Sequence, residues 1–319
     1  MRIIFSGTPD FASICLERLI LDGFEVVGVI TAPDRKKGRG QKLSPSPVKT
    51  LAEKHNMRVF QPTNLKDQDF LDELNLLNPD LGVVVAFRMM PEQLWSMPAL
   101  GTINLHASLL PNYRGAAPIN WAIINGEKKT GLTTFFLKHE IDTGDILLQE
   151  EILIRDSDDA GTLHDHLAEK GSELLSKTLD LIMQGNYHTT SQKDFISDGT
   201  DLKKAPKIFK KDCEVNWRQE SERIYDTIRG LSPYPSAWTT LKKMDGQPMS
   251  VKIFRTEKTN LSSKGKEGQI KTDSGELLIG TKSTFLKIID IQPEGRQKMA
   301  GSDFLRGYPE YCCTINSKS

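Results

Sequence analysis

The stretch NLHASLLPNYRGAAP, which begins at residue 104, places an amide and an imidazole two positions apart. Side chains alternate between the two faces of a β-strand, so a strand over residues 102–106 turns Asn104 and His106 to one face. An amide N–H and an imidazolium N–H that converge on one point form a donor pair suited to an oxyanion. The alternative is an Asn and a His that only satisfy the backbone groups of a turn.

A carboxylate follows further along, in the segment EIDTGDI that begins at Glu140. Parallel strands would bring this loop beside His106, where Asp142 would favour the charged imidazole and fix its orientation, as acid–base catalysis requires. Turn formation is the alternative role for Asp142 and the preferred role for Asp145. The sequence has no G-x-S-x-G motif and no Cys near this His, so we expect direct transfer between two bound substrates.

The residues between these motifs are expected to bind a ligand. Ser108 to Pro111 turn the chain, and Leu109 and Leu110 are expected to line an apolar slot. A planar heterocycle held by backbone polar groups would fit such a slot.

A scaffold of alternating strands and helices must position these groups. The pattern predicts strands at residues 2–6, 26–31, 81–86, 102–106 and 133–137, with helices ending at Leu21 and spanning 68–77, 117–125 and 163–183. Thr8 is expected to cap the first helix, with Pro9 at its first position. The alternation predicts a doubly wound, mostly parallel α/β sheet that holds ligands at the carboxyl ends of its strands. Gly7-Thr8-Pro9-Asp10 replaces the G-x-G-x-x-G fingerprint, which disfavours a nicotinamide cofactor.

The second half of the chain has a different pattern. A polar segment leads to a predicted helix at residues 220–231 and to short strands at 237–242, 249–255, 268–271, 276–279 and 285–291. Asp-Gly and Ser-Gly turns between short strands favour a small, OB-like β-barrel. We therefore predict a catalytic domain over residues 1–187, a linker over 188–208 and a smaller C-terminal domain over 209–319.

Charge is unevenly divided, although the whole chain is formally neutral. Residues 1–189 hold 19 Lys and Arg against 25 Asp and Glu, a net charge of −6, and residues 190–319 hold 23 against 17, a net charge of +6. A basic second half suits a polyanionic partner. Cysteines without metal-ligand spacing, and the lack of a leader or a long apolar run, predict a cytoplasmic protein with no metal and no membrane association. No self-complementary apolar stripe is visible, so we expect a monomer.

Four motifs together resemble the folate-dependent formyltransferase family over nearly the whole chain. They are Asn104-x-His106, Ser108-Leu109-Leu110-Pro111, Tyr113-Arg114-Gly115-Ala116-Ala117-Pro118 and Asp142-Thr143-Gly144-Asp145. The opening residues 2–12 and the loop 33–43 look like those of members that act on methionyl-tRNA. Where many members have Tyr-Gly before two apolar residues, this chain has Phe87-Arg88.

The resemblance implies a donor, an acceptor and their sites. The donor would be 10-formyltetrahydrofolate, the acceptor the α-amino group of methionyl initiator tRNA, and no metal would be needed. Asn104 and His106 would meet the tetrahedral oxyanion, and Asp142 would accept the amine proton. The pterin would lie between Ser108–Leu109–Leu110–Pro111 and Phe87, Met89 and Met90. The loop residues Arg35, Lys36, Lys37, Arg39 and Lys42 would grip tRNA phosphates.

Three other functions remain as alternatives. A formyltransferase acting on an amino-sugar nucleotide would share the Asn-x-His and Asp motifs, but the basic loop favours tRNA. An RNA-binding protein with an inactive formyltransferase fold is disfavoured by the intact Asn104, His106 and Asp142. A hydrolase would release formate from the folate donor to water.

Overall fold

A computed structural model describes residues 1–37, 42–196, 201–243 and 245–315 of the chain. Contacts divide it into two compact units that interleave along the sequence. Unit 1 comprises Met1–Gly115, Thr130–Leu153 and His164–Lys204, and unit 2 comprises Ala116–Lys129, Ile154–Leu163 and Ala205–Ser319. The linker expected at 188–208 stays a prediction, and its residues up to Lys204 group with unit 1.

Unit 1 is built on a seven-stranded sheet in the order β10-β9-β7-β6-β1-β2-β5. Parallel pairs join β1 to β2 and β6, and β6 to β7, whereas β9 runs antiparallel to β7. The strands are β1 (Arg2–Gly7), β2 (Glu25–Ile30), β5 (Val59–Phe60), β6 (Leu81–Val85), β7 (Thr102–His106), β9 (Lys129–Phe136) and β10 (Ile146–Leu153). The doubly wound, mostly parallel sheet predicted from the sequence is confirmed.

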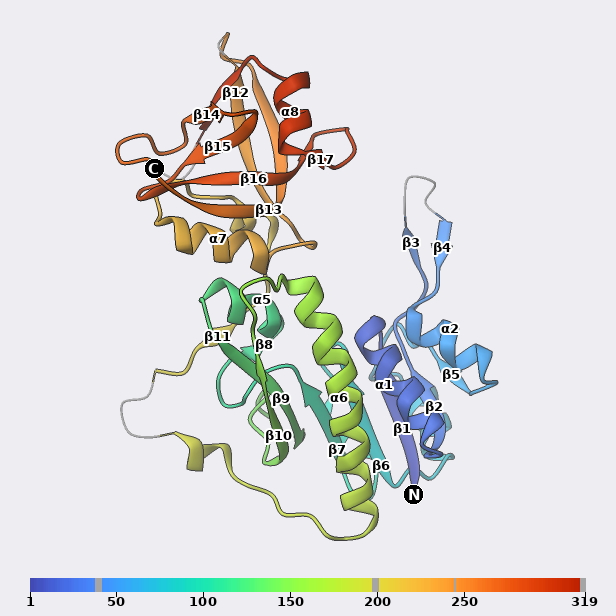
Figure 1. Ribbon diagram of the computed structural model, residues 1–319. Helices are drawn as coiled ribbons and strands as arrows, with labels where there is room; N and C mark the ends of the chain where they lie inside the picture. Colours follow the sequence, from blue (N-terminus) through green and yellow to red (C-terminus); the bar gives the residue numbers. More distant parts are fainter. Residues whose placement is uncertain (38–41, 197–200, 244, 316–319) are drawn as a thin grey trace. The chain divides into compact units, whose positions relative to one another are not determined.

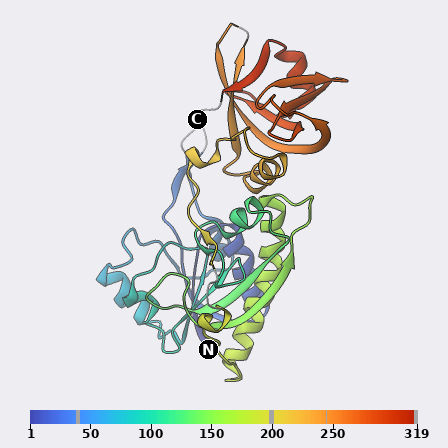
Figure 2. The same ribbon diagram turned by 90° about the vertical axis from the view of Figure 1, so that its left-hand side faces the viewer.

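Helices cover this sheet (Figures 1 and 2). They are α1 (Asp10–Leu21), α2 (Pro47–Lys54), α3 (Gln68–Asn75), α4 (Glu92–Trp95) and the long α6 (Ala160–Met183). A Cβ added to Gly171 of α6 would meet Leu105 Cδ2 at 3.0 Å and Phe11 of α1 at 3.4 Å. Gly171 therefore lets α6 lie close to the face of β7 that carries Leu105. Asn104 and His106, which alternate with Leu105, point to the opposite face.

The start of α1 differs from the prediction by one position. Pro9 is the N-cap with ψ of 179°, which is extended, and the helix begins at Asp10. No side chain caps this end, so the expected role of Thr8 is wrong. Asp10 instead places a negative charge in the first turn, where the helix dipole favours it.

Unit 2 contains an antiparallel sheet that curls on itself (Figures 1 and 2), in the order β14-β15-β16-β13-β12-β18 with β17 beside β16. The strands are β12 (Ala237–Lys243), β13 (Pro248–Ser262), β14 (Ile270–Asp273), β15 (Glu276–Gly280), β16 (Thr284–Pro293), β17 (Met299–Ala300) and β18 (Tyr311–Ile315). This agrees with the OB-like barrel predicted for the second half. Helices α5 (Pro118–Ile124), α7 (Ser221–Gly230) and α8 (Gly301–Gly307) complete the unit. Its buried cluster includes Trp217, Ile224, Ile228 and, from α5, Ile124.

Candidate active site

Strand β7 covers residues 102–106 as predicted, and it carries two of the candidate catalytic side chains. Asn104 pairs with Val84 of β6 and with Phe135 of β9, and His106 pairs with Thr133. Asn104 is half-buried, whereas His106 is only 7% exposed. The neighbouring strands therefore fix the backbone that presents both groups.

The imidazole of His106 is held in one orientation. Its Nε2 lies 2.9 Å from the carbonyl oxygen of Tyr113. A carbonyl only accepts hydrogen bonds, so Nε2 carries a proton and donates it. The other nitrogen, Nδ1, lies 3.9 Å from Asp142 Oδ2, which is longer than a hydrogen bond. Nδ1 is thus the nitrogen that remains for proton exchange.

Asp142 reaches His106 by a different route from the one predicted. We expected parallel strands to bring its loop to the end of β7, but β9 is antiparallel and its last residue, Phe136, pairs with Ile103 at the start of β7. The loop after β9 has to double back. Leu137 N donates to Thr102 O at 2.8 Å and Phe136 N donates to Asp145 O at 3.1 Å, which holds the returning chain against the sheet.

Local geometry then fixes Asp142 itself. Its backbone φ is 55°, in the left-handed region that an Asp side chain tolerates. Its Oδ2 accepts a hydrogen bond from Gly115 N at 2.9 Å. A Cβ on Gly144 would lie 1.6 Å from Phe136 O, so only glycine allows the loop to pass so close to β9. The carboxylate and the imidazole therefore meet through a loop that the sheet itself constrains.

The segment Ser108–Leu109–Leu110–Pro111, predicted to hold a heterocycle, is largely interior. Leu110 is buried with Phe135 and Ile146, and Ser108 is buried with its Oγ donating to Asn112 O at 2.7 Å. Gln149 Nε2 donates to Leu110 O at 2.9 Å. The path of this segment is thus well fixed, and its part in ligand binding stays a prediction.

The other predicted wall, residues 87–90, follows β6. Phe87 and Met90 pack partly buried against a cluster that contains Leu94, whereas Met89 is 75% exposed. The Arg88 guanidinium folds back, donating to Thr63 O at 3.0 Å and to Pro62 O. Arg88 is therefore fastened to a neighbouring loop at the edge of this wall.

The basic segment forms a hairpin rather than an irregular loop. Strands β3 (Arg35–Lys37) and β4 (Lys42–Ser44) pair antiparallel, and Arg35 and Lys36 are exposed. Arg39, predicted to bind tRNA, lies outside the described residues, as do the side chains of Lys37 and Lys42. Lys49, also basic and nearby, forms an ion pair with Asp34 at 2.8 Å.

One buried residue of the site was missed by sequence reasoning. Gln192 is 2% exposed, within the polar segment that was interpreted as a linker. Its Nε2 donates to Asp142 O at 2.9 Å and to Gly144 O at 2.8 Å, and its Oε1 accepts from Arg114 Nε at 3.0 Å. Neither periodicity nor a motif marks this residue, because its partners are 48 to 78 positions away in the sequence.

The described residues contain no group of three or more His, Cys, Asp or Glu that could hold a metal ion. In the same part of the chain, no helix has both the length and the apolar character that crossing a membrane requires.

Comparison with known proteins shows the family to which this chain belongs. The formyl transferase family model matches residues 1–179, and the model for the formyl transferase C-terminal domain matches residues 207–309. The methionyl-tRNA formyltransferase of Parabacteroides distasonis is 49% identical over 97% of this chain and 96% of its own length. That of Phocaeicola vulgatus is 50% identical over 97% of this chain and 96% of its own length. The chain belongs to the methionyl-tRNA formyltransferase family.

Solved structures share the fold of this formyltransferase family at low sequence identity. A HypX variant from Aquifex aeolicus is 19% identical with a TM-score of 0.65, covering 97% of this chain and 47% of that one. WlaRD, a sugar 3N-formyl transferase, is 17% identical with a TM-score of 0.64, covering 93% of this chain and 99% of that one. Sugar N-formyltransferases are therefore similar in fold, whereas the methionyl-tRNA enzymes are similar in sequence along the whole chain.

Proposed function

We propose that this chain transfers the formyl group of 10-formyltetrahydrofolate to the α-amino group of methionyl initiator tRNA, at the start of translation. The observation that carries the proposal is the 47–50% identity to methionyl-tRNA formyltransferases along nearly the full chain. The sugar-nucleotide alternative has support only from fold similarity at 17–18% identity.

The proposed chemistry needs no covalent intermediate with the enzyme. The neutral amine attacks the formyl carbon, so a C–N bond forms and the carbonyl oxygen gains negative charge. The bond from the formyl carbon to folate N10 then breaks. One proton leaves the amine and one reaches N10, so the reaction balances without a metal or a redox partner.

The geometry of the three polar residues supports the role that we propose for each. Asn104 and His106 share a face of β7 and would both donate to the oxyanion, the largest single contribution expected in acyl transfer. Because Nε2 of His106 is bonded to Tyr113 O, the donating nitrogen is Nδ1. Asp142 would accept the amine proton directly or through water. The separation of 3.9 Å between Nδ1 and Oδ2 suits groups whose hydrogen bonds tighten only when substrate is bound.

The same proposal assigns the binding surfaces. Residues Ser108 to Pro111, with Phe87, Met89 and Met90, would hold the pterin. The basic hairpin with Arg35, Lys36, Lys37, Arg39 and Lys42 would bind tRNA phosphates, and the C-terminal domain would add non-specific affinity for tRNA. The protein would act as a cytoplasmic monomer, and a reducing compartment would keep the buried thiols of Cys15 and Cys213 reduced.

A direct test uses the purified full chain with the formyl donor and methionyl initiator tRNA. Formyl-methionyl-tRNA and tetrahydrofolate should appear in equal amounts. An amino-sugar nucleotide in place of tRNA should give no formylated product, and the donor alone should release little formate. Formylated sugar, or formate release as fast as transfer, would contradict the proposal.

A further inference from the structure

Gln192 sits at the junction of the two segments that meet at Asp142. Segment 142–144 supplies two carbonyl oxygens to its amide N–H groups, at 2.9 and 2.8 Å. Segment 114–115 supplies the Arg114 guanidinium, whose Nε donates to Gln192 Oε1 at 3.0 Å. One side chain, nearly excluded from solvent, thus satisfies three partners from two loops.

These interactions form a closed ring with the candidate catalytic carboxylate. Gly115 N donates to Asp142 Oδ2 at 2.9 Å, and Arg114, its covalent neighbour, holds Gln192. Gln192 in turn holds the carbonyl of Asp142. Segment 114–115 therefore holds Asp142 twice. Gly115 binds the side chain of Asp142 directly, and Arg114 holds its main chain through Gln192.

The ring maintains a backbone conformation of Asp142 that an isolated loop would not keep. Asp142 has a φ of 55°, a region that non-glycine residues visit at a cost and keep only when the surroundings impose it. Without the Gln192 amide, the carbonyl groups of Asp142 and Gly144 and the Arg114 guanidinium would lose hydrogen bonds. Leaving buried polar groups unpaired costs free energy, so the ring is stable as a unit. Burial lowers the pKa of Arg114, with Asp142 and Glu140 opposing this effect through their charges.

The segment that carries Gln192 is fastened on both sides. Thr190 and Ile146 exchange two backbone hydrogen bonds, at 2.8 and 2.9 Å, just after the Asp142 loop. Further along, Tyr113 N donates to Lys203 O at 2.6 Å. Gln192 and Lys203, which both fall in the predicted linker, therefore bond to residues of the candidate site.

We infer that Gln192 is a positioning residue, which sets the orientation of the Asp142 carboxylate by tying the 142–144 turn to Arg114. Gln192 is nearly excluded from solvent and bonded to the main chain of Asp142, so it would act through Asp142 and not by contact with the substrates. The inference rests on the proposed function, because it assigns Asp142 a catalytic role.

Two variants and a control test it. Gln192→Ala should lower kcat about 10- to 100-fold, the scale for displacing a catalytic group by about 1 Å, with KM for the folate donor within about twofold. Gln192→Glu keeps an acceptor for Arg114 but turns a carboxylate oxygen toward two carbonyl oxygens, so its kcat should be no higher. Thr178→Val is the control, because it removes buried hydrogen bonds to Thr134 Oγ1 and Leu174 O on α6. It should lower stability to a similar extent and leave kcat unchanged.

A double-mutant cycle separates positioning from general support of the fold. In an Asp142→Ala background, Gln192→Ala should reduce the residual rate by less than about twofold, because its only route of action is already gone. Multiplicative losses, or near-normal kcat in Gln192→Glu, would overturn the inference.

Hydrogen exchange gives a readout independent of activity. In Gln192→Ala, residues 137–145 should exchange faster than in the unmodified chain, whereas β6 should not. If the unmodified chain forms no formyl-methionyl-tRNA, the proposed function fails while this exchange result still tests the ring. Unchanged exchange at 137–145 would contradict the ring itself.

Discussion

His106 Nδ1 lies 3.9 Å from Asp142 Oδ2, although the strand that leads to Asp142 runs antiparallel to the strand that carries His106. The returning loop, not the strand order, creates this pair. The Asp142 carboxylate has two separate roles. Its charge faces the imidazole, and its Oδ2 anchors the loop by accepting a hydrogen bond from Gly115 N. Substitutions that keep one role and remove the other can separate them.

Asp142→Asn and Asp142→Ala should both lose most formyl transfer, but for different reasons. The Asn side chain still offers an oxygen to Gly115 N, so the loop stays in place and only the charge is lost. The Ala variant also releases the loop. We expect similar losses of kcat, with faster hydrogen exchange at residues 137–145 in the Ala variant alone. A well-folded Asn variant with near-normal kcat would remove the carboxylate from the mechanism.

Asn104→Ala and His106→Ala should each lower kcat by roughly 100- to 1000-fold, the usual loss for one oxyanion donor. Both residues lie on β7, whose backbone pairing does not depend on their side chains, so the circular dichroism spectrum and tRNA binding should be retained. Single-turnover assays at saturating folate would measure the chemical step. Turnover within a few-fold of normal in either variant would exclude that residue as a donor.

Gly144→Ala should disable the site by a steric effect. The new Cβ would lie 1.6 Å from Phe136 O, a backbone atom that cannot move without disturbing β9. The loop must shift, and Asp142 must shift with it, so we expect kcat to fall at least as far as in Gln192→Ala. Gly185→Ala is the control, because a Cβ there meets nothing within 4 Å, although its φ of 64° is left-handed. Its cost should be only about 1–2 kcal/mol in stability, with kcat retained.

The sequence predicted the parts of the site that depend on local pattern. The alternation at residues 102–106 was sufficient to place Asn104 and His106 on one face of a strand, because strand periodicity is local. The position of Asp142 beside His106 was predicted correctly but by the wrong route, since the direction of β9 depends on tertiary pairing. Gln192 was missed because its interactions are long-range and its polar neighbours are typical of a linker. Leu110 is buried with Phe135, a packing arrangement that no periodicity reveals, and its expected place in the lining of a slot stays a prediction.

The ion pair between Asp34, directly before β3, and Lys49 should weaken at low pH. The Lys49 side chain, and then Gln61, lower the pKa of Asp34 by hydrogen bonding. Because the pKa of Asp34 is lower in the folded chain, the Asp34–Lys49 pair adds to the free energy of unfolding at pH values above the unfolded pKa of 3.8. This stabilisation is lost as the pH falls through the pKa of the folded state. A carboxyl-carbon NMR titration should place the Asp34 midpoint below 3.8, and Lys49→Met should raise it toward 3.8. Lys54→Met, on the same helix, should leave it unchanged; an equal shift in both variants would contradict the pairing.

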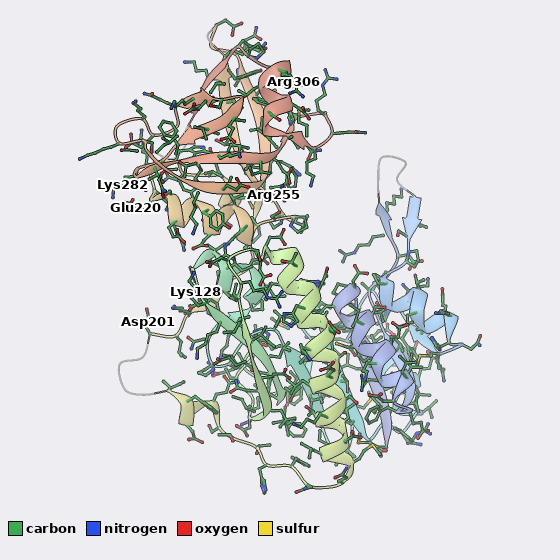
Figure 3. All side chains as sticks on the ribbon, in the orientation of Figure 1. Lys128, Asp201, Glu220, Arg255, Lys282 and Arg306 are labelled. Carbon is green, nitrogen blue, oxygen red and sulfur yellow. The ribbon has the colours of Figure 1, made fainter. Side chains whose placement is uncertain are left out.

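Residues 190–319 have a net charge of +6 and belong mostly to unit 2, but many of the cations of unit 2 are already paired. Lys282 and Glu220, both labelled in Figure 3, form an ion pair at 2.8 Å. Arg255 lies 3.6 Å from Asp290. The segment 207–211 differs, because Lys207, Lys210 and Lys211 are exposed together beside an exposed Phe209. Its backbone is anchored, since Trp238 Nε1 donates to Lys210 O at 2.8 Å. Exposed lysines with an aromatic ring on a fixed backbone suit a nucleic-acid backbone.

Replacing Lys207, Lys210 and Lys211 by Glu in the whole chain should therefore raise KM for tRNA and leave kcat and folate KM nearly unchanged. A fragment beginning near residue 205 would be a poor test, because α5 supplies Ile124 to the buried cluster and Asn120 Nδ2 to Gly230 O at 2.7 Å. For each lysine that binds a phosphate, its replacement should reduce the dependence of log KM on log salt by about one unit. The matched control replaces the exposed Lys54, Lys66 and Lys177 of unit 1 by Glu, which changes net charge equally. A similar rise in KM in both triple variants would mean that net charge alone steers tRNA. A rise limited to initiator tRNA would mean that this segment reads identity, and its assignment to non-specific affinity would be wrong.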